Sequence, residues 1–229
     1  MKRNVKLWVS AGLLLLFVFW TVAVKSIDVA AIGPEESTVG FSGLNGFIHN
    51  LTGTNFILYT VTDWLGLVPI ATCLGFAILG LCQMIKRKSI SKVDRDILLL
   101  GGFYLVVTAV YILFEYVVIN RRPILINGYL EVSYPSSTTM LVMCVMPTAM
   151  MQLDKRISNK IIKHCINTAI LIFTIFMVSG RLISGVHWVT DIIGGALCSG
   201  GLVMMYAGLT HSYIEEDYYV DQHKTRFKR

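Results

Sequence analysis

Long apolar runs separated by shorter polar segments dominate the chain. Six runs approach the length that crosses a membrane, about 20 mainly apolar residues, and the fourth does so only marginally. They are Leu7–Val24, Phe56–Ile85, Ile97–Ile119, Thr139–Leu153, Ile161–Val178 and Val189–Leu209. This pattern predicts an all-α fold, a polytopic membrane bundle of six transmembrane helices. The first run is longer than the apolar core of a secretory signal, which predicts an uncleaved anchor.

Composition supports a membrane protein. The 229 residues are 55% hydrophobic and 15% charged, with a mean hydropathy of +0.65. Soluble domains carry about 25% charged residues, so this chain lacks the polar coat of a soluble globule. Disorder is excluded because it requires low hydrophobicity. The 5 cysteines lie in or beside apolar runs without a CxxC pair, which predicts small buried side chains rather than disulfides.

The basic residues are concentrated in alternate connections. Of the 20 Lys and Arg residues, 16 precede the first run, follow the sixth, or lie in the second–third and fourth–fifth connections. By the positive-inside rule, these segments and both termini are predicted to be cytoplasmic, and the other connections extracytoplasmic. The net charge of +6 is therefore interpreted as a topology signal and as contact with anionic lipid, rather than as a nucleic-acid site.

A single multi-pass domain in the cell membrane is predicted over residues 1–210, with a charged cytoplasmic tail at 211–229. The one long polar connection, Ser26–Asn55, has weak helical patterning near Leu44–Leu51. We expect it to cover the extracytoplasmic end of the bundle or to lie along the membrane interface. The pattern predicts no oligomeric state.

The connection between the fifth and sixth runs carries residues suited to nucleophilic chemistry. His187 and Asp191 are four residues apart, so they share one face of a helix. A carboxylate bonded to one ring nitrogen fixes the imidazole tautomer and leaves the other nitrogen free to attack or bind. Arg181 precedes the histidine across a glycine-containing loop that can fold back. The alternatives are a capping aspartate and an arginine that anchors the helix at the interface.

The connection between the third and fourth runs offers groups that bind anions. It contains Arg122-Pro123 and, further on, the stretch Pro135–Thr139, which reads Pro-Ser-Ser-Thr-Thr. That stretch predicts a helix start, and taken alone it favours simple capping. The free N–H groups of a helix start also bind anions. With guanidinium groups from both connections, an extracytoplasmic phosphate pocket is the simpler interpretation.

These residues resemble the motifs of the type 2 phosphatidic acid phosphatase superfamily, which includes lipid phosphate phosphatases and vanadium haloperoxidases. The motifs are written KxxxxxxRP, PSGH and SRxxxxxHxxxD. Arg122-Pro123 resembles the end of the first motif, and Pro135-Ser136 the start of the second. Arg181, His187 and Asp191 keep the spacing of the third, which is the most specific match.

The resemblance implies a membrane hydrolase that removes phosphate from lipids. His187 would be the nucleophile, forming a phosphohistidine, and Asp191 would orient it. The phosphoryl oxygens would be bound by backbone N–H groups and by Arg122, Arg181, Ser136 and Ser137. The substrate would be a phosphorylated lipid, either a phosphatidate-like monoester or a polyprenyl diphosphate. Neither a metal nor another cofactor is implied.

Three positions depart from the motifs. Glu115 stands at the lysine position of the first, Gly180 at the serine position of the third, and Thr138 at the histidine position of the second. In the family that histidine is the catalytic acid, and a threonine hydroxyl is not a useful acid near neutral pH. General acid catalysis contributes about 10²–10⁴-fold, so activity is expected to be impaired. The alternative is a non-catalytic relative that binds phosphorylated lipid as a receptor, scaffold or flipping protein.

Three further polar residues have two interpretations each. His49 is expected to pack in its loop, although it could supply the missing acid. Glu115 is expected to pair with Arg121 or Arg122, since opposite charges stabilise each other where water is scarce, although it could also be protonated. Asp63 is expected to hydrogen-bond a neighbouring helix rather than to join the pocket.

Overall fold

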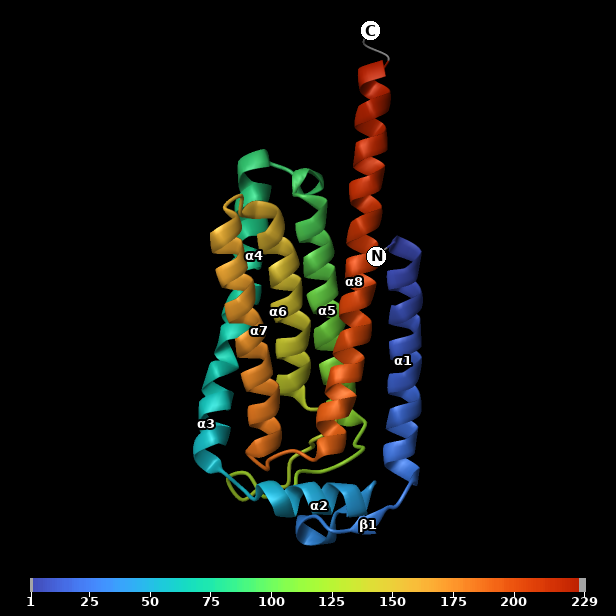
Figure 1. Ribbon diagram of the computed structural model, residues 1–229, viewed down its shortest axis with the longest axis vertical. Helices are drawn as coiled ribbons and strands as arrows, with labels where there is room; N and C mark the ends of the chain where they lie inside the picture. The colour runs from blue at the N-terminus through green and yellow to red at the C-terminus, as the bar shows by residue number, and fades with distance from the viewer. Residues whose placement is uncertain (1, 227–229) are drawn as a thin grey trace.

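The computed structural model describes the backbone of residues 2–226 and the side chains as far as Thr210. Apart from one two-stranded hairpin, its regular elements are helices (Figure 1). In chain order they are α1 (Arg3–Ser26), β1 (Ala30–Ala31), η1 (Pro34–Glu36), β2 (Thr38–Val39), α2 (Ser42–Thr52), α3 (Phe56–Leu65), α4 (Leu67–Arg87), η2 (Ile90–Lys92), α5 (Arg95–Tyr116), α6 (Ser137–Arg156), α7 (Lys160–Ile183) and α8 (Val189–Arg226). The two strands pair antiparallel, with Ala30 opposite Val39.

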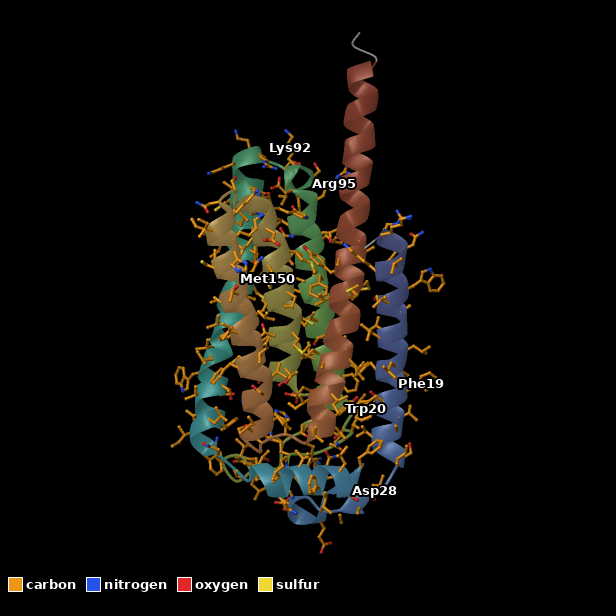
Figure 2. All side chains as sticks on the ribbon, viewed as in Figure 1. Phe19, Trp20, Asp28, Lys92, Arg95 and Met150 are labelled. Carbon is orange, nitrogen blue, oxygen red and sulfur yellow. The ribbon has the colours of Figure 1, made fainter. Side chains whose placement is uncertain are left out.

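The long helices run side by side and give the bundle two distinct ends (Figure 1). The start of α1 lies toward the same end as the C-terminal part of α8. α2 and the β1–β2 hairpin lie across the opposite end, which we call the α2 end and which also contains the loops 117–136 and 184–188. Lys92 and Arg95 lie away from the α2 end, whereas Asp28 lies at it (Figure 2). The basic α4–α5 connection is thus on the side of the termini.

Within the part of the chain that the structure describes, five helical segments are long and apolar enough to cross a membrane: Arg3–Ser26, Phe56–Arg87, Arg95–Tyr116, Lys160–Ile183 and Val189–Thr210. They correspond to five of the predicted spans. The fourth predicted span is helix α6, which is not among them. α6 packs against α4, α5, α7 and α8 and buries Thr148 and Gln152, so much of its surface faces protein rather than lipid. A count of six spans stays a prediction.

The second predicted span is two helices rather than one. α3 ends at Leu65 and α4 begins at Leu67, with Gly66 between them. Pro69 has no N–H, and a proline ring collides with the carbonyl four residues earlier, which here belongs to Leu65. The break leaves α3 as a half-length helix at the α2 end, where it packs against α7.

Helices α1 and α8 pack closely because α8 presents glycines to α1. A Cβ atom at Gly201 would lie 2.7 Å from Leu14, and one at Gly208 would lie 2.6 Å from Leu7. Small residues let membrane helices approach, and Ser10 adds a 2.8 Å hydrogen bond from Oγ to the carbonyl of Gly201. α1 is therefore an integral part of the bundle.

The predicted boundary at residue 210 does not coincide with the end of a helix. α8 continues to Arg226 and projects beyond the rest of the bundle (Figure 1). The last three residues, 227–229, lie outside the described residues. The division into a membrane domain and a cytoplasmic tail stays a prediction.

Candidate functional site

Two loops and the helix ends that flank them build a polar site at the α2 end. The loop between α5 and α6 folds back on itself, because the N–H of Arg122 bonds the carbonyl of Glu131 (3.0 Å) and that of Ser133 bonds the carbonyl of Asn120 (3.0 Å). In the shorter loop, Gly185 has a positive φ of 67°, and a Cβ there would lie 1.8 Å from the carbonyl oxygen of Gly53. Only glycine fits this close approach between the loops.

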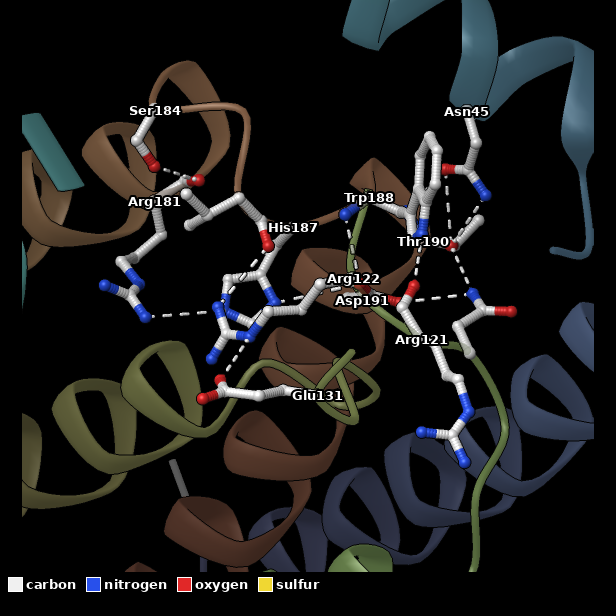
Figure 3. Close-up of polar contacts among 12 residues, drawn as sticks. Asn45, Arg121, Arg122, Glu131, Arg181, Ser184, His187, Trp188, Thr190 and Asp191 are labelled. Atoms are coloured by element: carbon white, nitrogen blue, oxygen red, sulfur yellow. Dashed lines mark hydrogen bonds and ion pairs between the residues drawn. The ribbon is translucent and has the colours of Figure 1, made fainter. Parts of the chain in front are cut away.

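His187 is at the centre of the site (Figure 3). Its Nε2 lies 3.3 Å from Nη1 of Arg122 and 3.5 Å from Nη2 of Arg181. Its Nδ1 lies 3.7 Å from Oδ2 of Asp191. All four side chains are buried. The structure therefore brings together four of the predicted site residues, with one ring nitrogen facing the carboxylate and the other facing two guanidinium groups.

The environment of His187 keeps its imidazole neutral. Burial, and next the positive charges of Arg122 and Arg181, lower the pKa of His187 well below its usual 6.5. A neutral imidazole carries its proton on one nitrogen and a lone pair on the other. With the proton on the side of Asp191, the lone pair is on Nε2 and points between the two arginines. This is the arrangement of a nucleophile that faces an anion site.

Asp191 is held by the polypeptide around it. Its Oδ2 accepts a hydrogen bond from the backbone N–H of Trp188 (3.0 Å), and its Oδ1 accepts one from Nδ2 of Asn120 (3.2 Å). The 3.7 Å separation from His187 is longer than a hydrogen bond, and such contacts are often long in ligand-free sites. Asp191 is thus fixed in position and available to orient the ring.

Arg122 is paired with Glu131. Its Nε lies 2.9 Å from Oε2 of Glu131, and its Nη1 donates to the carbonyl oxygen of Val186 (3.4 Å). Among the described residues, Glu115 forms an ion pair with neither Arg121 nor Arg122, so that prediction was wrong. Glu115 instead lines a cavity beside His187 together with Tyr111, from the same helix. The reason is local: the loop folds back at Glu131, which places that carboxylate beside the arginine.

Arg181 is the most enclosed guanidinium group of the site. The residue is 1% exposed, and its Nε and Nη1 have no hydrogen-bond partner among the described residues. Its guanidinium lies 5.1 Å from the ring centroid of Tyr59, and Nη1 lies 3.6 Å from Oδ1 of Asp63. Asp63 therefore faces the site through Arg181, at a distance longer than a hydrogen bond, which fits the alternative that it joins the pocket rather than the expected hydrogen bond to a neighbouring helix. Buried donors without partners are well suited to bind an anion.

The start of α6 completes the site. Ser136 is its N-cap, and the hydroxyl groups of Ser136 and Thr139 are buried without a hydrogen-bond partner. The N–H of Ser136 donates to the carbonyl of Asp191 (3.1 Å), which ties this helix start to α8. Ser137 lines a cavity together with His187. Thr138 is half-buried, and it is not among the residues that line this cavity.

Comparison with known proteins identifies the family. The model of the PAP2 superfamily matches residues 70–213, more than half of the chain, including Arg122, His187 and Asp191. The chain belongs to the PAP2 superfamily. A solved structure, described as the first transmembrane PAP2 type phosphatidylglycerolphosphate phosphatase from Bacillus subtilis, matches with a TM-score of 0.59 over 90% of this chain and 97% of that chain. At 20% identity this match shows a shared fold, and no curated protein sequence matches the chain.

In this PAP2 protein, a second layer of polar residues that sequence analysis missed supports Asp191. Nδ2 of Asn45, in α2, donates to Oγ1 of Thr190 (3.0 Å), and Nδ2 of Asn120 lies 3.3 Å from the same atom. The indole N–H of Trp188 donates to the carbonyl of Arg121 (2.7 Å; Figure 3). The only sequence signal was position, since Asn120 directly precedes the two arginines and Asn45 lies in the weak helical pattern.

His49 packs against a neighbouring side chain, as expected, although it lies in helix α2 rather than in a loop. Its ring lies 5.5 Å from that of Trp188, and burial lowers the pKa of His49. Among the described residues, no three His, Cys, Asp or Glu side chains form a group suited to hold a metal ion. The groups that this PAP2 site offers a ligand are guanidinium, hydroxyl and imidazole, a set that suits a phosphate.

Proposed function

We propose that this PAP2 protein is an integral membrane phosphatase that hydrolyses phosphate monoesters or diphosphates of lipids. One observation carries the proposal: Nε2 of His187 faces Arg122 and Arg181, while Nδ1 faces Asp191. A nucleophile, its orienting carboxylate and two phosphate-binding cations are thus present in one buried site.

The reaction would proceed through a phosphohistidine. The two guanidinium groups and the start of α6 bind the phosphoryl oxygens and place phosphorus near Nε2 of His187, which attacks it. Negative charge on these oxygens is stabilised in a buried site by donors already in position. Asp191 stabilises the positive charge that develops on the imidazole. Water then attacks phosphorus, releases inorganic phosphate and regenerates neutral His187.

We place the site on the extracytoplasmic side of the membrane. The site is at the α2 end, and the basic connection that carries Lys92 and Arg95 is at the opposite end (Figure 2). Basic connections favour the cytoplasm. A site at the ends of the membrane helices is also within reach of a lipid headgroup, which supports a lipid rather than a soluble phosphate as the substrate.

Phosphate release by the full-length protein in detergent tests this proposal. Phosphatidate, phosphatidylglycerophosphate and a polyprenyl diphosphate serve as substrates. We expect release of inorganic phosphate, loss of release in His187→Ala, and acid-labile phosphate on the native protein but not on the variant. His164→Ala, an exposed histidine near the opposite end of α7, is the matched control and should retain full activity.

The second candidate is a lipid-binding relative without turnover, and Thr138 at the position of the family's catalytic histidine favours it. Binding of phosphatidate without phosphate release, in both the native protein and Thr138→His, would establish that candidate and contradict ours. Equal release of phosphate by the native protein and by His187→Ala would also contradict the proposed phosphohistidine mechanism.

A further inference from the structure

A cavity of about 20 Å³, room for about one water molecule, is lined by His187 and by one carboxyl group, that of Glu115. Its lining joins the start of α6, at Ser137, to the last two turns of α5, where Glu115 and Tyr111 lie. Ser133, from the loop between these helices, also lines it. Glu115 and the candidate nucleophile therefore face the same small space, although they are 72 residues apart in sequence.

Glu115 has no cationic partner among the side chains that the structure describes. Arg122 is paired with Glu131, and Arg181 faces Asp63. Tyr111, one turn earlier in α5, lines the same cavity as Glu115. Among the described residues, the Glu115 carboxyl group is therefore not neutralised by an arginine.

A phosphate bound in this site changes what Glu115 can do. A carboxylate repels a phosphate bound at the neighbouring arginines, whereas a carboxylic acid donates a hydrogen bond to a phosphate oxygen. Glu115 is exposed, so its carboxyl group is in contact with water. These are the requirements for a group that gives a proton to a departing oxygen.

We propose that Glu115 is the general acid of this enzyme and protonates the leaving-group oxygen. The inference rests on the proposed phosphatase function. Nε2 of His187 forms a bond to phosphorus, the bond between phosphorus and the leaving oxygen breaks, and the Glu115 proton moves to that oxygen to release an alcohol. In the second step Glu115, now a carboxylate, takes a proton from the attacking water, the phosphorus–nitrogen bond breaks, and inorganic phosphate leaves.

Two departures from the family motifs are then related, because one removes a catalytic acid and the other supplies one. Thr138 removes the acid from the second motif, and Glu115 replaces the lysine of the first with a side chain that can carry a proton. The other acidic and imidazole groups at the α2 end are less well placed. His49 packs on Trp188, and Asp63 lies beside Arg181 and does not line the cavity.

The dependence of the rate on the leaving group tests this assignment. An alkyl leaving group, as in phosphatidate, requires protonation, whereas the nitrophenolate of p-nitrophenyl phosphate departs without it. For Glu115→Gln we expect a loss of about 100-fold in kcat on phosphatidate and little change on p-nitrophenyl phosphate. Activity on the aryl substrate also shows that the variant is folded. Glu35→Gln, an exposed carboxylate at the same end, should change neither rate.

An equal loss of activity on both substrates, or no loss on either, would overturn the assignment.

The variant Thr138→His, with Glu115 unchanged, is a second test of the same assignment. If Glu115 already supplies the proton, the added histidine changes the rate on phosphatidate by less than about threefold. An increase of about tenfold or more would show that the native site lacks an acid. Absence of release from every substrate would reject the proposed phosphatase itself, whereas release that is unaffected by Glu115→Gln would reject the acid alone.

Discussion

Asn120 donates a hydrogen bond from Nδ2 to Oδ1 of Asp191 over 3.2 Å. The other oxygen of this carboxylate, Oδ2, is the one that faces His187. Asn120 thereby fixes the rotation of the Asp191 carboxylate, although its own side chain does not reach the arginines. This makes Asn120 a positioning residue for the proposed nucleophile.

Replacing Asn120 with alanine should lower kcat about tenfold and leave KM nearly unchanged. A buried carboxylate oxygen that loses its donor costs about 1–3 kcal/mol, and 1.4 kcal/mol corresponds to a factor of ten. The measurement is steady-state hydrolysis of a lipid phosphate, with Asn50→Ala, an exposed asparagine of α2, as the control. An increase in KM with an unchanged kcat would instead assign Asn120 to substrate binding.

The pH dependence of kcat/KM should report the neutral state of His187. Because burial and the two arginines lower its pKa, the acidic limb of the profile is expected below pH 6.5, after correction for ionisation of the substrate. Below pH 6.5 this histidine binds a proton in the unfolded protein before it does so in the folded one. The free energy of unfolding therefore falls as the pH is lowered below 6.5. A limb centred at or above 6.5 would contradict this environment.

Asp63→Asn should strengthen the binding of inorganic phosphate. The carboxylate competes with an anion for Arg181, but it is 3.6 Å away and its side chain is 59% exposed. Such a pair is worth at most about 1 kcal/mol, so the inhibition constant for phosphate should fall by no more than about fivefold. The matched control is Glu36→Gln at the same end of the bundle. Weaker inhibition in Asp63→Asn would mean that Asp63 orients Arg181 rather than competing for it.

Gly194→Ala should destabilise the protein. A Cβ at this position would lie 2.5 Å from the buried ring of Tyr134, which is held by a 2.7 Å hydrogen bond between its hydroxyl and that of Thr21. Overpacking of this kind costs about 1–3 kcal/mol. Thermal unfolding in detergent measures the effect as a Tm lower by several degrees. Gly75→Ala has no atom within 4 Å of the new Cβ and should unfold at or above the native Tm.

The sequence predicted those parts of the site that depend on local spacing. His187, Asp191 and Arg181 lie within 11 residues of one another, so their meeting was predictable from sequence. The predicted shared helix face was wrong, because His187 lies in the loop before α8, which begins at Val189. Glu131 was not found because it meets Arg122 only where their loop folds back on itself, and Asn45 was not found because its partner Thr190 lies in α8, far along the chain. The break between α3 and α4 was missed because hydropathy does not register the single backbone N–H that Pro69 lacks.

The long-range contacts of α2 and α3 have a consequence for how much of the chain constitutes the working protein. The family match starts at residue 70, after both helices. Yet Asn45 bonds Thr190 beside the reactive carboxylate, and Asp63 faces Arg181. A fragment that begins at the family boundary would keep every motif residue and lose these contacts. The segment by which the enzyme is recognised is therefore shorter than the segment that holds its site together.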